Sequence, residues 1–302
     1  MDESDVNGGS SRLGGDRAHT WGGDRAVAGR NFLSREISAT VTDGRYGYVK
    51  IASWNINSLR KRQDRLFAWL EETKPDIVCL QETKCTDEQF PVLALQAAGY
   101  HSAYHGEKSY NGVAILTKIE PRDVRSALCD EVVDPQARVI AATINAGRVF
   151  SVYAPNGQAV GSPAYEYKLK WYARLRDCLL KEESAELVIC GDFNVAPEDV
   201  DVHDPDLWRG AIMCSDGERR AFRQLCEGGY RDTLRLHRKE SGLFTWWDYR
   251  MLSFPKNRGL RIDAILASKP LAKKCTDAGI DRDMRKGKEP SDHAPVWAEF
   301  KE

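Results

Sequence analysis

Polar side chains that can bind cations or move protons recur at the ends of short apolar runs in this sequence. They are Asn55, Asn57, Gln81, Glu82, Tyr153, Asp192, Asn194, Asp263, Asp292 and His293. Ends of neighbouring strands converge in space, and sheets carry their sites there. A buried group of carboxylates is costly unless a cation lies among them, and oxygen ligands suit Mg²⁺ or Mn²⁺ rather than zinc. The pattern therefore predicts a metal-assisted active site.

Each of these residues, taken alone, has a simpler interpretation. An Asp or Asn that follows a strand most often caps a helix or forms a turn. The segment Ser291–Pro295 can also be a plain turn, and a single histidine is more often structural than catalytic. Their conjunction at successive strand ends favours one site over a set of separate turns.

The apolar runs before these residues have the length and composition of strands. Strands are expected over Val49–Trp54, Asp76–Gln81, Gly112–Thr117, Arg138–Ile144, Arg148–Tyr153, Glu186–Gly191, Arg261–Ala267 and Ala294–Phe300. Two helical faces lie between them, traced by Leu59, Leu66, Trp69 and Leu70 and by Tyr165, Leu169, Tyr172, Leu175, Leu179 and Leu180. The pattern predicts α with β in one domain.

The first 47 residues differ from the rest of the chain. They are rich in Gly, contain no Lys and twice repeat Gly-Gly-Asp-Arg-Ala, which predicts a flexible tail over residues 1–47. Their six Arg against seven Asp and Glu favour a plain tail over a basic arm for DNA. No Gly/Ser/Pro-rich linker divides residues 48–302, so these are expected to form a single catalytic domain.

The composition is typical of a globular protein in a reducing compartment. With 302 residues, 42% hydrophobic and 29% charged, the chain can bury a sizeable core. Its apolar runs fall far short of the roughly 18 residues that a membrane helix needs. The 8 cysteines include no C-x-x-C pair. The chain opens with Met1–Asp5 and has no apolar signal segment, so a cytoplasmic location is expected.

Six ordered blocks between Val49 and Phe300 resemble the exonuclease III family of AP endonucleases. The blocks are Trp54–Asn57, Leu80–Lys84, Tyr153–Gly157, Gly191–Asn194, Gly259–Asp263 and Ser291–Pro295. The resemblance implies an α+β fold, a four-layer sandwich of two packed mixed β-sheets flanked by helices. It also implies a Mg²⁺-dependent phosphodiesterase, with Mn²⁺ as a possible substitute. The expected reaction is cleavage 5′ to an abasic site in duplex DNA, together with 3′-to-5′ exonuclease and 3′-phosphodiesterase activity.

The resemblance also implies roles for the residues of these blocks. Metal ligands are expected among Asn55, Glu82, Asp192, Asn194, Asp292 and His293, with Glu82 as the first choice. Asp192 is similar to the aspartate that activates water in the family, and Asn194 can orient it. Asp263 is expected to hold a charged His293 that donates to the phosphate. Tyr153 is expected to present its hydroxyl to the phosphate or the attacking water.

A separate set of residues is expected to bind the DNA. It comprises Lys84, Tyr110, Asn111, Trp246, Trp247, Arg250, Leu260 and Ile262. Aromatic side chains interleaved with arginines can wedge into a duplex while the arginines bind phosphates. By resemblance, Trp246, Leu260 and Ile262 wall a pocket for a sugar without its base. The alternative for the Trp246–Trp247 pair is two tryptophans in an ordinary core. The run Arg60–Arg62 is a further candidate, with a solvated helix face as the alternative.

Two other functions stay open on the sequence alone. Inositol-polyphosphate phosphatases, sphingomyelinases and deoxyribonuclease I relatives share the catalytic residue types, and the aromatic and arginine segments favour the repair enzyme over them. An inert DNA-binding module would show substitutions at the four site carboxylates, and none is present. These are Glu82, Asp192, Asp263 and Asp292. The expected partner is duplex DNA with abasic sites or blocked 3′ ends, bound by a monomer with no membrane contact. In a bacterium the location would be the nucleoid.

The formal charge of −1 argues at first sight against a nucleic-acid partner. Without the tail, residues 48–302 hold 38 basic and 38 acidic residues. A neutral sum still allows a positive face, because several acids would be engaged with the metal or with histidine. A basic rim around the acidic site is therefore expected from Lys84, Arg250, Lys256, Arg258 and Arg261.

Overall fold

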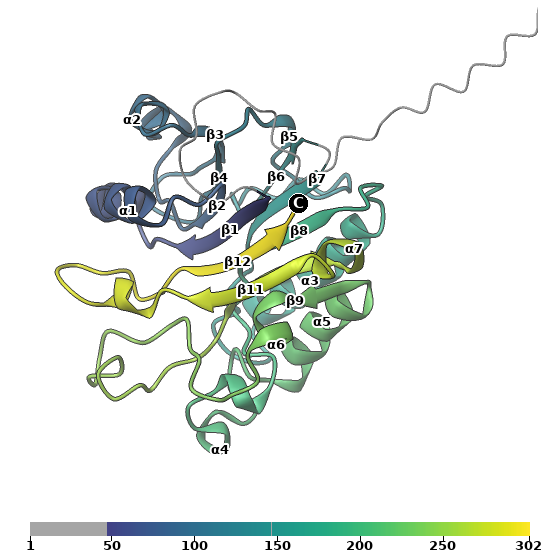
Figure 1. Cartoon of the computed structure of the whole chain (residues 1–302). Helices are drawn as coiled ribbons and strands as arrows, with labels where there is room; N and C mark the ends of the chain where they lie inside the picture. Colours follow the sequence, from purple (N-terminus) through teal and green to yellow (C-terminus); the bar gives the residue numbers. More distant parts are fainter. Residues whose placement is uncertain (1–46, 146) are drawn as a thin grey trace, which may run out of the picture.

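The computed structural model describes residues 47–145 and 147–302. Within them, two six-stranded sheets pack face to face, with the strand orders β11-β12-β1-β2-β4-β3 and β5-β6-β7-β8-β10-β9. Helices cover the outer faces, α1 and α2 on the first sheet and α3 and α5 on the second (Figure 1). The four-layer α+β sandwich expected from the sequence is therefore confirmed.

The strands and helices have the following bounds. The first sheet contains β1 (Tyr48–Asn55), β2 (Ile77–Gln81), β3 (His101–His105), β4 (Val113–Thr117), β11 (Cys275–Ile280) and β12 (Val296–Lys301). The second contains β5 (Arg122–Arg125), β6 (Val139–Ile144), β7 (Gly147–Tyr153), β8 (Leu187–Asp192), β9 (Tyr230–Asp232) and β10 (Asp263–Ser268). The helices are α1 (Leu59–Thr73), α2 (Val92–Ala97), α3 (Pro163–Leu179), α4 (Pro205–Trp208), α5 (Asp216–Glu227), α6 (Thr233–His237) and α7 (Lys269–Ala272).

Each sheet contains one parallel strand pair joined by a helix. Strands β1 and β2 run parallel and are connected through α1, and β7 and β8 run parallel and are connected through α3. The other pairings in both sheets are antiparallel. This topology brings the carboxyl ends of β1, β2, β7 and β8 to the same end of the sandwich as the start of β10.

Central strands are buried on both faces, which explains their continuous apolar runs. Alternate side chains point into two different cores: Ile51 lies between the sheets, whereas Ala52 packs under the helices. Cys79 and Cys190 are buried between the sheets in the same way. The apolar face predicted for α1 is buried as expected. On the face predicted for α3, Leu169 is half-buried and Leu180, just beyond the helix, is 66% exposed.

All eight strands expected from the sequence are present, with ends shifted by one or two residues. Strands β3, β5, β9 and β11 were not among those expected, because they are short or polar and lie at the edges of the sheets. The tail predicted over residues 1–47 falls, apart from Gly47, outside the described residues. No helix among the described residues combines the length and hydropathy needed to cross a bilayer.

Two of the eight cysteines are joined. Cys129, in the connection from β5 to β6, forms a disulfide with Cys178 of α3 across 49 residues of sequence. The remaining six are free thiols. The spacing of the cysteines along the chain did not indicate this bond, because it depends on how the β5–β6 connection crosses α3. It runs against the expectation of a fully reduced chain.

Candidate active site

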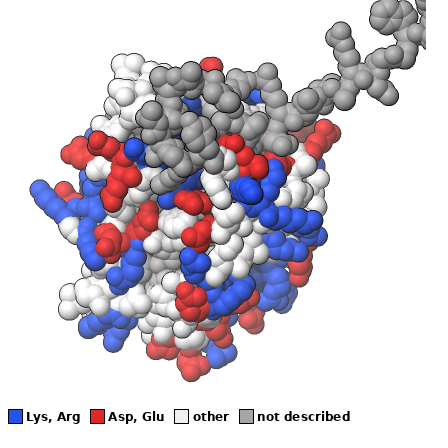
Figure 2. All heavy atoms as spheres, viewed as in Figure 1, with Lys and Arg blue, Asp and Glu red and all other residues white. Residues whose placement is uncertain are grey.

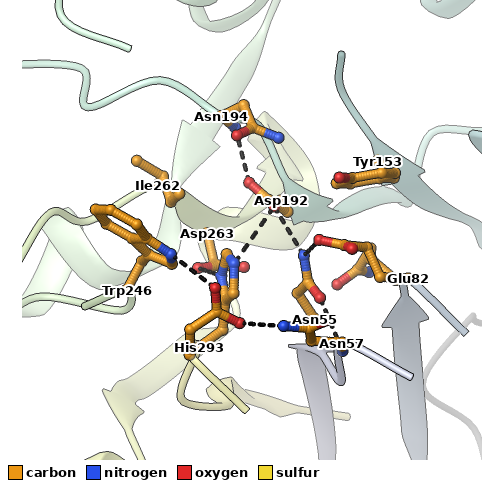
Figure 3. Close-up of polar contacts among 12 residues, drawn as sticks. Asn55, Asn57, Glu82, Tyr153, Asp192, Asn194, Trp246, Ile262, Asp263 and His293 are labelled. Carbon is orange, nitrogen blue, oxygen red and sulfur yellow. Dashed lines mark hydrogen bonds and ion pairs between the residues drawn. The ribbon is translucent and has the colours of Figure 1, made fainter. Parts of the chain in front are cut away.

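Strand ends bring the predicted polar residues together. Asn55 ends β1, Glu82 follows β2, Tyr153 ends β7 and Asp192 ends β8. Asp263 begins β10 directly opposite Asp192 in the antiparallel register. His293 lies on the loop before β12, beside the end of β1 because these two strands are paired. The convergence predicted from the sequence is therefore present (Figure 3).

Asn55 connects the two sheets through its side-chain amide. Its Nδ2 donates to Glu82 Oε1 at 2.8 Å and to Asp192 Oδ2 at 2.9 Å. Its Oδ1 accepts from the backbone N–H of Asn57 at 3.0 Å. Asn55 thus presents donors, not its oxygen, to the acidic pair, which differs from the arrangement of an oxygen ligand.

Glu82, Asp192 and His293 form the group that fits a metal ion. One ligand atom of each lies within 4.8 Å of the other two. Lys84 Nζ contacts Glu82 Oε2 at 2.6 Å and Asn57 Oδ1 at 2.6 Å, so a positive group already lies against this carboxylate. The carboxylate oxygens of Glu82 and Asp192 suit a hard divalent cation.

His293 lies between two aspartates. Its Nδ1 is 2.8 Å from Asp263 Oδ2, and its Nε2 is 3.7 Å from Asp192 Oδ2. Burial alone would lower the pKa of His293, but Asp263 and Asp192 outweigh it and raise the pKa to about 10. The imidazole is therefore positively charged and its Nε2–H points toward the site.

Asp192 has an environment suited to a base. Burial raises its pKa to about 7, against the lowering effect of His293. The backbone N–H of Asn194 donates to Asp192 Oδ1 at 2.8 Å, which fixes the carboxylate plane. The side chain of Asn194 instead donates to Ala154 O at 2.9 Å. Asn194 thus orients Asp192 through its backbone rather than through the side-chain amide.

Tyr153 faces Glu82 and Asp192 from β7 (Figure 3). Burial and then the charges of Glu82 and Asp192 raise the pKa of Tyr153 well above its ordinary value, so the phenol remains a donor. The guanidinium of Arg138 lies 4.8 Å from the ring centroid, a contact that strand patterns in the sequence did not indicate.

Asp292 lies beside His293 but accepts two hydrogen bonds from neighbours. Asn57 Nδ2 donates to its Oδ1 at 2.8 Å and Trp246 Nε1 to its Oδ2 at 3.1 Å. Burial would raise the pKa of Asp292, but His293 and these two donors lower it. Asp292 therefore stays ionised, and its two hydrogen bonds connect the metal group to the aromatic segment.

An apolar cluster adjoins the acidic residues. Leu260 and Ile262 are buried with Met213 and Cys214, and Trp246 packs against them with part of its ring exposed. Trp246 pairs through its backbone with both Leu260 and His293. The three pocket residues predicted by resemblance therefore lie together and next to the charged group, whereas Met213 carried no recognisable signal in the sequence.

Trp247 does not belong to this surface. It is fully buried, packs edge-on against Phe254 and donates from Nε1 to Asn257 Oδ1 at 3.2 Å. The prediction that Trp247 contacts DNA is wrong, because the side chain on the neighbouring residue of an extended segment points to the opposite side. The core alternative holds for this one of the two tryptophans.

The basic rim is smaller than expected. Arg261 is buried and binds Asp201 at 2.6 and 3.0 Å and Asp232 at 2.6 Å, so it cannot reach a phosphate. Arg62 is also buried, with its donors directed to the Asn57 and Pro290 carbonyls and the Tyr249 hydroxyl. Both arginines hold loops in place. Arg261 is therefore not part of the basic rim, and Arg62 neither contacts DNA nor lies on a solvated helix face.

Other candidates lie on the surface. The Arg250 side chain is 84% exposed and pairs with Asp248, and Tyr110 is 71% exposed. Lys256 and Arg258 line a surface pocket of about 420 Å³ with His203. Asn111 donates to Glu107. In Figure 2, Lys and Arg side chains are interspersed with Asp and Glu over the face in view.

Comparisons with known proteins agree on one family. Residues 52–293 match the model of the endonuclease/exonuclease/phosphatase family. The exodeoxyribonuclease III of Haemophilus influenzae is 41% identical over 270 residues, covering 84% of this chain and 100% of the relative.

Two solved structures show the same architecture. A 3′ phosphatase from Neisseria bound to a product DNA hairpin has a TM-score of 0.82 at 43% identity, covering 84% of this chain and 100% of that chain. An AP endonuclease from Archaeoglobus fulgidus has a TM-score of 0.80 at 41% identity, covering 83% and 99%.

Proposed function

The chain belongs to the endonuclease/exonuclease/phosphatase family, and we propose that it is a DNA-repair nuclease that cleaves the phosphodiester 5′ to an abasic site. The family and the relatives named above make it a phosphodiesterase of the exodeoxyribonuclease III type, which acts on DNA. Exonuclease action and removal of blocked 3′ ends are further activities that we propose for the same site.

One observation carries the proposal. A charged group of Glu82, Asp192 and His293 lies directly beside an apolar wall that includes Trp246 and Ile262. Phosphodiester hydrolysis needs an activated water and neutralisation of charge at phosphorus. A sugar that has lost its base is compact and apolar enough to lie against such a wall, whereas an inositol polyphosphate would require cationic contacts there. The geometry thus favours the repair nuclease over the inositol phosphatase.

Each of three residues has a separate role in the proposed reaction. Asp192 accepts the proton of the attacking water, since its carboxylate is held by Asn194 and Asn55 and its pKa is close to neutral. The charged His293 donates from Nε2 to a phosphate oxygen, with Asp263 fixing the other ring nitrogen. Tyr153 donates its phenolic proton to the phosphate or the water.

We propose that Mg²⁺ or Mn²⁺ binds at Glu82, with Asp192 as the neighbouring carboxylate. A charged His293 has no free lone pair for the ion, so its prediction as a metal ligand gives way to its role as a donor to the phosphate. When bound, such an ion neutralises charge on the phosphate and stabilises the leaving oxygen. Asn55, Asn194 and Asp292 then serve to orient these groups, since their side chains are engaged in the hydrogen bonds described above.

The substrate contacts that we propose come from three sides. Trp246, Leu260 and Ile262 wall the sugar, Lys84 lies at the metal group, and Tyr110, Asn111 and Arg250 contact the DNA backbone. Every one of these groups comes from residues 48–302 of one chain, so we propose one catalytic domain that acts as a monomer. We propose a cytoplasmic location for an enzyme with this substrate and, in a bacterium, association with the nucleoid.

The test is incision of an end-labelled duplex that carries one abasic site. Cleavage 5′ to the lesion, abolished by EDTA and restored by Mg²⁺, is the expected result, and Asp192→Asn is the inactive control. An intact strand after prolonged incubation contradicts the proposal. Release of phosphate from inositol polyphosphates by the same preparation would support the alternative phosphatase.

A further inference from the structure

A lysine is completely buried beneath the active-site loops. Lys168, in the second turn of α3, is 0% exposed, and its Nζ has three acceptors. They are Asn194 O at 2.7 Å, Asn156 O at 3.1 Å and Glu218 Oε1 at 2.5 Å. All three protons of the ammonium are therefore used, and two of them hold backbone carbonyls of loops that follow β7 and β8.

The carbonyl that Lys168 holds belongs to Asn194, the residue whose backbone N–H orients Asp192. Asn194 has a φ of 51°, in the left-handed region, and its N–H donates to Asp192 Oδ1. Its side chain accepts from Asn156 Nδ2 at 3.2 Å. Left-handed backbone at a non-glycine residue persists only where its surroundings fix it. Lys168 supplies such a contact to the loops after β7 and β8 at once, through the Asn156 and Asn194 carbonyls.

Glu218 extends the same connection to a third loop. Besides Lys168, it accepts from the backbone N–H groups of Met213 at 3.0 Å and Ser215 at 3.1 Å. Met213 packs against the apolar wall with Leu260 and Ile262. The buried Lys168–Glu218 pair therefore joins the loop that carries Asn194, next to the proposed base, to the loop that carries Met213, behind the proposed sugar pocket.

Stability alone does not account for this pair. A buried ion pair can often be replaced by apolar residues at no cost in stability. An apolar residue, however, cannot donate to the Asn194 and Asn156 carbonyls, and these are what Lys168 holds. The ammonium of Lys168 therefore orients the Asn194 and Asn156 carbonyls, which an apolar side chain at this position could not do.

We propose that Lys168 is a positioning residue for hydrolysis: by holding the Asn194 and Asn156 carbonyls, it keeps the Asn194 N–H directed at Asp192. The Lys168 side chain contacts neither the substrate nor the groups that react. It acts on Asp192 through Asn194. The inference rests on the proposed function, in which Asp192 activates the attacking water.

The test compares Lys168→Met with Leu175→Ala, a buried substitution on the same helix that leaves both carbonyls untouched. We expect Lys168→Met to lower kcat on the abasic duplex by about 100-fold, with KM within threefold of wild type, since an oriented donor is worth about this much in turnover. Leu175→Ala is expected to lose stability but keep kcat per folded molecule. Wild-type kcat in folded Lys168→Met contradicts the proposal.

Glu218→Gln separates the carbonyl contacts from the ion pair. This variant keeps Lys168 and is expected to retain kcat within threefold, and a loss as large as that of Lys168→Met overturns the proposal. Should Lys168→Met not fold, Lys168→Leu, which also lacks a donor, takes its place with the same two outcomes. A wild type that leaves the abasic duplex intact contradicts the proposed function instead, so the two failures are distinguishable.

Discussion

Asp192 and Asp263 are register partners in the antiparallel pairing of β8 and β10, and His293 lies between their carboxylates. Two acids so close in a buried site require a positive group between them, and the imidazolium provides it. The pairing of two strands thus fixes the protonation state of His293, the residue that we propose donates to the phosphate.

Asp263→Asn should therefore lower turnover without unfolding the protein. Loss of the carboxylate removes the main support for the charge on His293 and leaves its tautomer unfixed, which we expect to cost about 10²–10⁴-fold in kcat. Single-turnover incision of the abasic duplex measures it. Full activity at saturating Mg²⁺ would make the Asp263–His293 pair purely structural.

The charge on His293 also makes stability depend on pH. Its pKa is raised from about 6.5 to about 10 in the folded state, so its contribution is fully present below pH 6.5 and is lost as the pH rises toward 10. Asp192, whose pKa is about 7, no longer titrates above pH 8. Urea unfolding at pH 7.5 and 9.5 should show a larger loss for wild type than for His293→Gln, and equal losses would contradict the assigned charge.

Metal binding should depend on Glu82 more than on Asn55. Glu82→Gln removes a charged oxygen ligand, and we expect Mn²⁺ affinity to fall by at least about tenfold. Asn55→Ala removes a donor to two carboxylates and should weaken Mn²⁺ less. Titration calorimetry of both variants, with EDTA-treated wild type as reference, compares the two losses. A stronger effect at Asn55 would show that its side chain turns to offer the oxygen.

The disulfide gives a prediction independent of catalysis. Cys129–Cys178 closes a loop of 49 residues, and a bond of that span stabilises a fold by about 2–4 kcal/mol. Thermal unfolding with and without dithiothreitol should therefore differ in wild type, while Cys129→Ser should give one curve in both conditions. Identical wild-type curves, with both thiols open to alkylation, would show that the bond does not form in solution.

How far the sequence predicts this site depends on whether chain order or tertiary packing decides a residue's place. Glu82 and Asp192 were predictable because each lies at the end of a buried apolar run, and strand ends converge in such a sandwich. The contrast between Trp246 and Trp247 was not, since the two differ only in which side of the segment faces the core. Lys168 escaped notice and Arg261 was wrongly placed on the basic rim, because a charged residue in a sequence is ordinarily solvated and only packing shows that both are enclosed.

Arg261 and Arg250 should behave in opposite ways when changed. Arg261→Met removes a buried cation from Asp201 and Asp232 and leaves these carboxylates undercompensated, so we expect unfolding to become easier by about 3–5 kcal/mol. Its DNA affinity should keep the salt dependence of wild type, because Arg261 is enclosed. Arg250→Ala removes an exposed cation, which should leave stability nearly unchanged and reduce the slope of log affinity against log salt by about 1. Fluorescence anisotropy with duplex DNA at several salt concentrations, paired with urea unfolding, measures both effects. A reduced salt slope in folded Arg261→Met would return Arg261 to the DNA-facing surface.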